Sequence, residues 1–229
     1  MKPLLIEIPV PIETNRLLIR PPVAGDGAEI NAATIESFDA LHEWMPWAKE
    51  KPSLEDSEEF ARRSQAEWIL RQNLCLLLFD RQTGSFVGGS GLHRIDWELP
   101  RFEIGYWVRN RFSGKGYITE STAAIAHFAF SALNAKRVEI RCDADNTRSS
   151  AIPQRLGFEL EATLKAEGMK VDGTGPCNTQ VFARLRPTGL PDFGVKWGVV
   201  EKALDNGVGP PTVTLAATPL RQTSSSQKK

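Results

Sequence analysis

The sequence lacks an excess of charge of either sign. Lysine and arginine total 28, aspartate and glutamate also total 28, and the formal net charge is zero. Proteins that attract nucleic acid or anionic lipid through general electrostatics carry a basic surplus. We therefore expect no nucleic-acid partner and no membrane partner.

Cysteine, histidine and long apolar runs are also scarce. Cys75, Cys142 and Cys177 lie far apart, and neither they nor the 3 histidines form a metal-binding spacing, so we expect no metal and a reducing compartment. The longest apolar run, residues 74–79, is too short to cross a bilayer. Prolines and glutamates in residues 1–14 interrupt any signal-peptide core. These features predict a cytoplasmic protein.

The composition changes after Arg186. The length of 229 residues suggests one domain with an extension, and the last part is rich in Pro, Gly, Ser and Thr without periodicity. We predict one domain over residues 1–186 and a partly disordered tail over 187–229. An apolar cluster at residues 193–200 is the exception, because it could dock on the domain or on a second subunit.

Apolar periodicity predicts an alternation of strands and helices typical of a mixed α/β fold. Asp26 and Ser53 are candidate helix caps, and Asn134 is a candidate left-handed C-cap. The order of elements favours an antiparallel meander followed by a β–α–β unit with one parallel strand pair. The predicted strands cover residues 16–20, 74–80, 87–96, 101–108, 136–143 and a closing hairpin in 168–185. The predicted helices cover 27–35, 53–73, 117–133 and 149–156.

A short cationic loop, RFSGKGY, separates a predicted strand from a predicted helix. The first N–H groups of a helix lack partners and favour anions, and glycines let the backbone approach a phosphate. Only Lys115 separates Gly114 from Gly116, which excludes the Walker spacing, and Thr119 stands where a Rossmann loop needs its third glycine. The pattern alone fits either an anion-binding loop or a plain turn with solvated cations.

The motifs in their order resemble those of a GNAT acetyltransferase, in the branch of the ribosomal-protein N-terminal acetyltransferases RimJ and RimL. The resemblance spans residues 13–186 and implies a mostly antiparallel sheet, flanked by helices, whose one parallel pair splays apart to bind coenzyme A. The motifs that carry it are ETNRLLIRP, WMPWA, GGSGLHRID, EIGYWV, RFSGKGYITEST, LNAKRVEIRCDADNTRSSAIPQRLGF and VFARL.

The resemblance implies acetyl-CoA as co-substrate and no metal. The loop at residues 111–117 would cradle the diphosphate, mainly with N–H groups from Ser113 to Ile118, and the strand at 106–108 would bind the pantetheine amides. Lys115 could equally be a solvated lysine. The implied coenzyme-binding residues are Tyr106, Trp107, Val108, Arg111, Phe112, Ser113, Gly114, Lys115, Gly116, Tyr117, Ile118, Asn146 and Arg148.

Acetyl transfer to an amine needs a proton acceptor and a stabilised thiolate. Glu103 matches the acid of EIGYW and is the candidate base or orienting group, or else a partner for a neighbouring cation. Ser149 could donate to the departing sulfur and Asn146 could hold pantetheine, or the pair could simply cap a helix. An α-amine, with a pKa near about 7.7–8.0, would need only a modest base.

The amine acceptor is less defined. Trp44, Trp47, His93 and Trp97 are candidates for lining its cleft, although each could simply pack. The resemblance implies an enzyme that acetylates a protein N-terminal α-amine or a small amine, as a monomer or homodimer. The alternative is a non-catalytic acetyl-CoA-binding sensor on the same fold.

Overall fold

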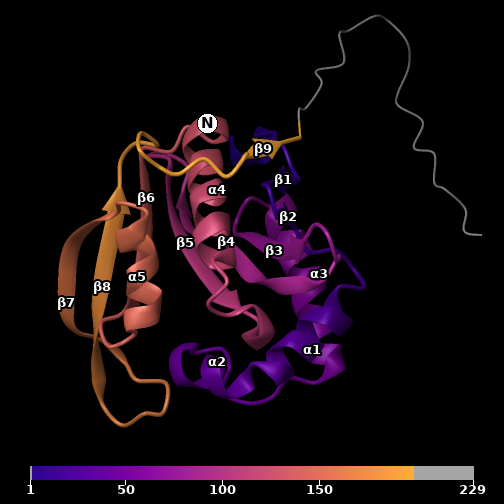
Figure 1. Cartoon of the computed structure of the whole chain (residues 1–229), viewed down its shortest axis with the longest axis vertical. Coiled ribbons are helices and arrows are strands. Elements are labelled where there is room, and N and C mark those ends of the chain that lie inside the picture. The colour runs from indigo at the N-terminus through magenta and orange to yellow at the C-terminus, as the bar shows by residue number, and fades with distance from the viewer. Residues whose placement is uncertain (1, 199–229) are drawn as a thin grey trace, which may run out of the picture.

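The computed structural model describes residues 2–198 and forms one mixed sheet with helices on both faces (Figure 1). The mixed α/β fold expected from the sequence is confirmed. The strands are β1 Ile12–Glu13, β2 Leu17–Arg20, β3 Leu74–Asp80, β4 Phe86–Asp96, β5 Arg101–Val108, β6 Arg137–Asp143, β7 Glu159–Met169, β8 Pro176–Arg184 and β9 Lys196–Trp197; the helices are α1 Gly27–Glu36, α2 Phe38–Trp44, α3 Leu54–Ile69, α4 Tyr117–Ala132 and α5 Thr147–Arg155, with short 3₁₀ turns at Pro3–Leu5 and Asn110–Phe112.

The sheet has the order β7-β8-β6-β5-β4-β3-β2-β1-β9. Within it β5 and β6 form the parallel pair, and the other neighbours are antiparallel. The long connection through α4 provides the crossover that a parallel pair requires. In Figure 1, β7 and β8 stand beyond β6 and away from the meander of β3, β4 and β5.

Residues of β3 alternate between two hydrophobic clusters, one on each face of the sheet. Leu76 and Leu78 pack in the cluster that contains the apolar side of α4. Leu77 packs with Phe86 against α1 and α3. Because successive strand residues point to opposite faces, a strand with helices on both sides is apolar throughout, as residues 74–79 are.

Two of the three predicted helix caps are present. Ser53 accepts a hydrogen bond from the N–H of Asp56 at 3.0 Å, and the Asp56 side chain completes the capping box. Asn134 has the left-handed φ of 55° expected after a helix. Asp26 is the N-cap residue of α1 as expected, but its carboxylate does not bind the first N–H groups of the helix and instead binds Arg20 at 2.7 Å.

The chain directly after Arg186 lies against the sheet. Leu190 is buried in the main core, and Phe193, Val195 and Trp197 pack on it. β9 pairs with β1, so Trp197 is part of the sheet. The domain boundary at 186 stays a prediction, and residues 199–229 of the expected tail, with Val199 and Val200 of the apolar cluster, lie outside the described residues.

Candidate active site

The parallel strands β5 and β6 separate part-way along their length. Their pairing covers Arg101, Phe102 and Glu103, opposite residues 137–139. Beyond this point β5 continues to Val108, paired only with β4, while β6 pairs with β8. The side of Tyr106–Val108 that faces β6 thus has no strand partner among residues 2–198, and an edge of this kind can accept an extended amide chain as an added strand.

The glycine loop ends in the left-handed conformation that its sequence suggested. Gly114 has φ of 73° and Gly116, the N-cap of α4, has φ of 80°. Within the described part of the chain, the N–H groups of residues 114–118 have no hydrogen-bond partner. The N–H of Ser113, which we expected to join this cradle, is already bonded to the carbonyl of Asn110 at 3.0 Å. Free N–H donors at a helix N-terminus favour the binding of an anion.

The cations near this loop have different partners. Arg111 forms an ion pair with Glu36 at 2.8 Å, and the buried Arg109 shares that carboxylate at 2.7 Å. Lys115 is exposed and lies over the Phe112 ring, which packs edge-on against Tyr117. Arg148 is exposed on α5. Two of the three guanidinium nitrogens of Arg111, Nε and Nη2, therefore face Glu36.

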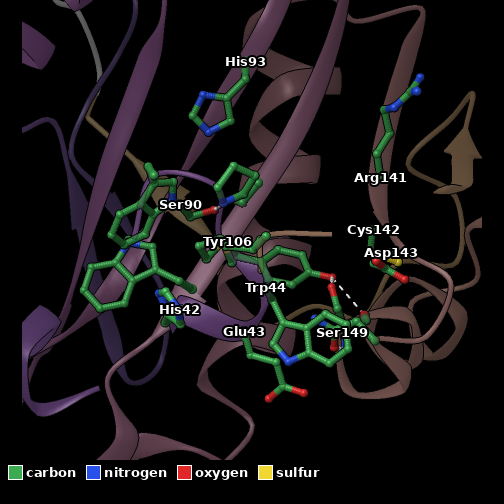
Figure 2. Close-up of a pocket in the computed structure, with 18 of the residues that line it drawn as sticks. His42, Glu43, Trp44, Ser90, His93, Tyr106, Arg141, Cys142, Asp143 and Ser149 are labelled. Carbon is green, nitrogen blue, oxygen red and sulfur yellow. Dashed lines mark hydrogen bonds between the residues drawn. The ribbon is translucent and has the colours of Figure 1, made fainter. Parts of the chain in front are cut away.

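A large cleft opens where the strands separate, with a volume of about 1140 Å³ (Figure 2). It is lined by residues of α1, α2, α3, β3, β4, β5, β6, β7 and β8 and their connections. The structure brings together the predicted residues Trp44, Trp47, His93, Glu103, Tyr106, Trp107, Asn146 and Ser149. Trp97 is not among the lining residues; it packs edge-on against Phe102 and donates to the carbonyl of Arg71 at 2.9 Å.

Glu103 lies where the strands begin to part. Its side chain is 17% exposed, and burial raises the pKa of its carboxyl, opposed by the charge of Arg94 and reinforced by that of Glu139. Arg94 Nε is 3.3 Å from Glu103 Oε2, yet this buried oxygen accepts no hydrogen bond from residues 2–198. A desolvated carboxyl with an incomplete set of partners is characteristic of functional sites.

Ser149 and Tyr106 are in contact at the wall of the cleft. The Tyr106 hydroxyl donates to the Ser149 carbonyl at 3.0 Å, and Ser149 Oγ lies 3.3 Å from the same hydroxyl (Figure 2). Burial raises the pKa of Tyr106, and burial also raises the pKa of the neighbouring Cys142 thiol to about 11. Two protonated hydroxyls therefore lie beside the opening between β5 and β6.

Asn146 is the N-cap of α5, accepting from the N–H of Ser149 at 3.0 Å. Ser149 itself lies inside the helix, so the predicted helix start at 149 is two residues late. The capping role holds for Asn146 and not for Ser149.

The sequence pattern did not reveal the acidic character of the cleft. Its lining contains eight carboxylates and four lysines or arginines. Glu167 on β7 pairs with Arg141 at 2.8 Å, and Asp145 lies 3.7 Å from Lys170. These residues come from separate strands and loops, so no local motif could have identified them.

Over the described residues, no cluster of His, Cys, Asp and Glu is arranged to hold a metal ion. No helix in the same part of the chain is long and apolar enough to cross a membrane.

The family model described as "Acetyltransferase (GNAT) domain" matches residues 16–159, which include the strand opening and the glycine loop. This chain belongs to the GNAT acetyltransferases. It is thus an acetyl-CoA-dependent acyltransferase. The free N–H groups of residues 114–118 and the unpaired side of β5 fit the diphosphate and pantetheine parts of this co-substrate.

Two similar proteins have names that refer to ribosomal proteins. The chain is 32% identical over 152 residues to "Putative ribosomal N-acetyltransferase YdaF" of Bacillus subtilis, covering 65% of this chain and 80% of that protein. It is 29% identical over 144 residues to the ribosomal-protein-serine acetyltransferase of Escherichia coli, covering 62% and 79%.

A solved structure of RimL, a ribosomal L7/L12 α-N-protein acetyltransferase in complex with coenzyme A, has the same fold. The TM-score is 0.70 at 20% identity, and the match covers 79% of this chain and 98% of RimL. The expected resemblance to the RimJ and RimL branch is confirmed.

Proposed function

We propose that this acetyltransferase transfers the acetyl group of acetyl-CoA to the N-terminal α-amine of a protein. The observation that carries the proposal is the acidic cleft at the point where β5 and β6 separate. Eight carboxylates against four lysines or arginines favour a cationic acceptor. The names of the ribosomal-protein acetyltransferases that this chain is similar to support the same class.

The openness of the cleft favours a peptide. Its volume of about 1140 Å³ includes the opening between β5 and β6, which the pantetheine arm would occupy. The wall that follows α2 carries Trp47, a residue that is 54% exposed. An extended N-terminal segment fits such an open cleft with its ammonium directed toward Glu103.

Glu103 has two available roles toward the acceptor. As a carboxylate it attracts and orients the ammonium group, and as a base it takes the proton directly or through water. The raised pKa of its carboxyl brings it closer to that of the amine. The amine nitrogen then attacks the thioester carbonyl carbon within the ternary complex.

Ser149 and Tyr106 are proposed to assist the departing thiolate. The carbon–sulfur bond breaks as the amide forms, and negative charge moves to the sulfur. The Ser149 hydroxyl can donate a hydrogen bond to that sulfur, with the Tyr106 hydroxyl beside it. A donor aimed at developing charge lowers the barrier of this step.

The test uses a peptide with a free N-terminus and one internal lysine. Release of the coenzyme A thiol is followed during turnover, and mass spectrometry locates the acetyl group. We expect it on the α-amine. The N-formylated peptide, with the same lysine, serves as the matched control and should give no product.

Acetylation of the lysine alone, or turnover only with small amines, would refute the proposed acceptor. Peptides beginning with the N-terminal sequences of ribosomal proteins are the first candidates, because of the names of the similar proteins.

A further inference from the structure

His93 and Glu103 are direct neighbours across β4 and β5. They are partners in the antiparallel register, so both side chains lie on the same face of the sheet, and both line the cleft. A register shift follows at once between His93 and Asp96, where Arg94 has a left-handed φ of 45°. Such an irregularity beside a functional site redirects the side chains next to it.

Two glycines make room for the His93 ring. A Cβ on Gly91 would lie 3.0 Å from Cε1 of the ring, and a Cβ on Gly105 would lie 3.2 Å from Nε2. The imidazole therefore packs closely over the backbone of β4 and β5. Its position is fixed before any acceptor enters, which is a requirement for an effective proton acceptor.

A hydrogen-bond relay determines which nitrogen of His93 carries the proton. Asn73 Nδ2 donates to Glu67 Oε2 at 3.0 Å, and a carboxylate can only accept. The Asn73 amide is thereby oriented with Oδ1 toward His93 Nδ1, at 2.7 Å. Because Oδ1 also only accepts, Nδ1 must be the protonated nitrogen.

The second ring nitrogen is left with a lone pair. His93 Nε2 has no hydrogen-bond partner among residues 2–198. It is absent from the fully buried atoms without partners in this part of the chain, so it is accessible to solvent. It belongs to a residue of the cleft wall, labelled in Figure 2. An unprotonated Nε2 open to the cleft is an acceptor for an amine proton.

Glu103 is less free to take that proton. Its Oε2 is buried and is 3.3 Å from Arg94 Nε, so part of the carboxylate is withdrawn from the cleft. Its negative charge remains available to orient an ammonium group. The two neighbours are therefore suited to different tasks.

Building on the proposed function, we infer that His93 Nε2 is the general base, that Asn73 and Glu67 position it, and that Glu103 orients the incoming ammonium. The ammonium first loses one proton through Nε2 to solvent. The neutral nitrogen then attacks the thioester carbonyl carbon and, as the carbon–nitrogen bond forms, loses its second proton to Nε2, directly or through water. The carbon–sulfur bond then breaks and its electron pair leaves on the thiolate. The imidazolium releases its proton to solvent after turnover.

The surroundings of His93 keep the base in its neutral form. Burial lowers the pKa of His93, and the charge of Glu67 on α3 opposes this effect. Glu103 on β5 and Arg94 on β4 add one charge of each sign nearby. At neutral pH the ring is therefore unprotonated, as a base requires.

The first experiment compares a spectroscopic and a kinetic pKa. The chain has only 3 histidines, so long-range ¹H–¹⁵N spectra resolve each imidazole, and His93→Gln identifies the signal. We expect the Nδ1–H tautomer and a pKa below the ordinary 6.5. The acid limb of kcat/KM for the peptide should follow the same pKa.

Glu67→Gln tests the relay from outside the cleft. A glutamine at 67 can donate to Asn73 Oδ1, which lets the amide turn its Nδ2 toward His93 and favours the opposite tautomer. We expect kcat to fall roughly tenfold, since a positioned base contributes about 10²–10⁴-fold. Glu55→Gln, on the same helix and far from the relay in sequence, should leave both tautomer and rate unchanged.

The double variant Glu67→Gln with Asn73→Asp moves the base pKa. A carboxylate facing Nδ1–H stabilises the imidazolium, so the His93 pKa and the acid limb should rise together by about one unit or more. Circular dichroism checks folding, and His127→Gln is the control for loss of an uninvolved histidine.

The inference would be overturned if the acid limb of the kcat/KM profile did not follow the His93 pKa in any variant and shifted only with Glu103→Gln. So would the Nε2–H tautomer in the unchanged protein. Failure of α-amine acetylation is a separate result, because the tautomer and the kinetic match can be measured with any accepted amine.

Discussion

Arg16 binds Glu120 through two nitrogens and binds the glycine loop, at Lys115, through the third. Its Nε and Nη2 each lie 2.6 Å from Glu120 Oε2, and its Nη1 donates to the carbonyl of Lys115 at 3.0 Å. The guanidinium also lies 4.4 Å from the centre of the Tyr117 ring. Glu120 is buried in the first turn of α4 and accepts from Thr14 at 2.6 Å. One arginine thus fixes the loop to the N-terminal strands.

Arg16→Lys should therefore weaken the diphosphate site specifically. Lysine keeps the charge but cannot form the same fork of bonds. We expect KM for acetyl-CoA to rise several-fold, while kcat/KM for acetyl-pantetheine, which has no diphosphate, stays nearly constant. Arg20→Lys, which alters a comparable pair with Asp26, is the control. Equal losses with both thioesters would mean a general structural defect.

Gly116→Val should disturb the same site through the backbone. A φ of 80° is strained for a β-branched residue, although the added Cβ would meet nothing closer than Arg16 Nη2 at 3.5 Å. We expect acetyl-CoA affinity in calorimetric titration to fall tenfold or more, about 1.4 kcal/mol. Gly84→Val has a similar φ of 68° in a distant turn and controls for strain. Unchanged binding in a folded Gly116→Val protein would contradict the loop assignment.

Glu103→Gln should stabilise the fold in a pH-dependent way. The pKa of Glu103 is raised in the folded protein, so ionisation of this carboxyl lowers the free energy of unfolding. The loss begins as the pH rises through the pKa of the unfolded chain, near 4.5, and is complete above the pKa of the folded protein. We expect Tm to rise at pH 7.5 and to match that of the unchanged protein near pH 4. A gain that is the same at both pH values would have another origin.

Ser149→Ala should slow the chemical step without loosening the coenzyme. Removing a donor near the departing sulfur should lower kcat by roughly tenfold or more at all pH values, while acetyl-CoA affinity changes less than a few-fold. Ser149→Thr, which keeps a hydroxyl, should recover part of the rate. Ser150→Ala, one residue away and bonded only to the Thr147 carbonyl among described partners, is the control. A fall in affinity without a fall in kcat would place Ser149 in binding alone.

The sequence by itself determined the local features of this protein. Glycines at 114 and 116 permit a left-handed loop before a helix, and the fully apolar run at 74–79 requires cover on both faces. The order of such segments identified the mixed sheet, and the motifs identified the family. These features are recoverable because each depends on residues close together in the chain.

Tertiary structure decided how the site is completed. Arg16 lies 104 residues from Glu120, and Asn73 lies 20 residues from His93, so no periodicity or motif connects the partners. β6 pairs with β5 only over residues 137–139, whereas β8 pairs with residues 138–143 on its other edge, and this arrangement is set by strands far apart in the chain. The proton position on His93 of β4 depends on the Asn73 amide, which Glu67 orients from the last turn of α3. Side-chain spacing along a chain fixes which face a residue occupies, but only folding brings distant faces within hydrogen-bonding distance.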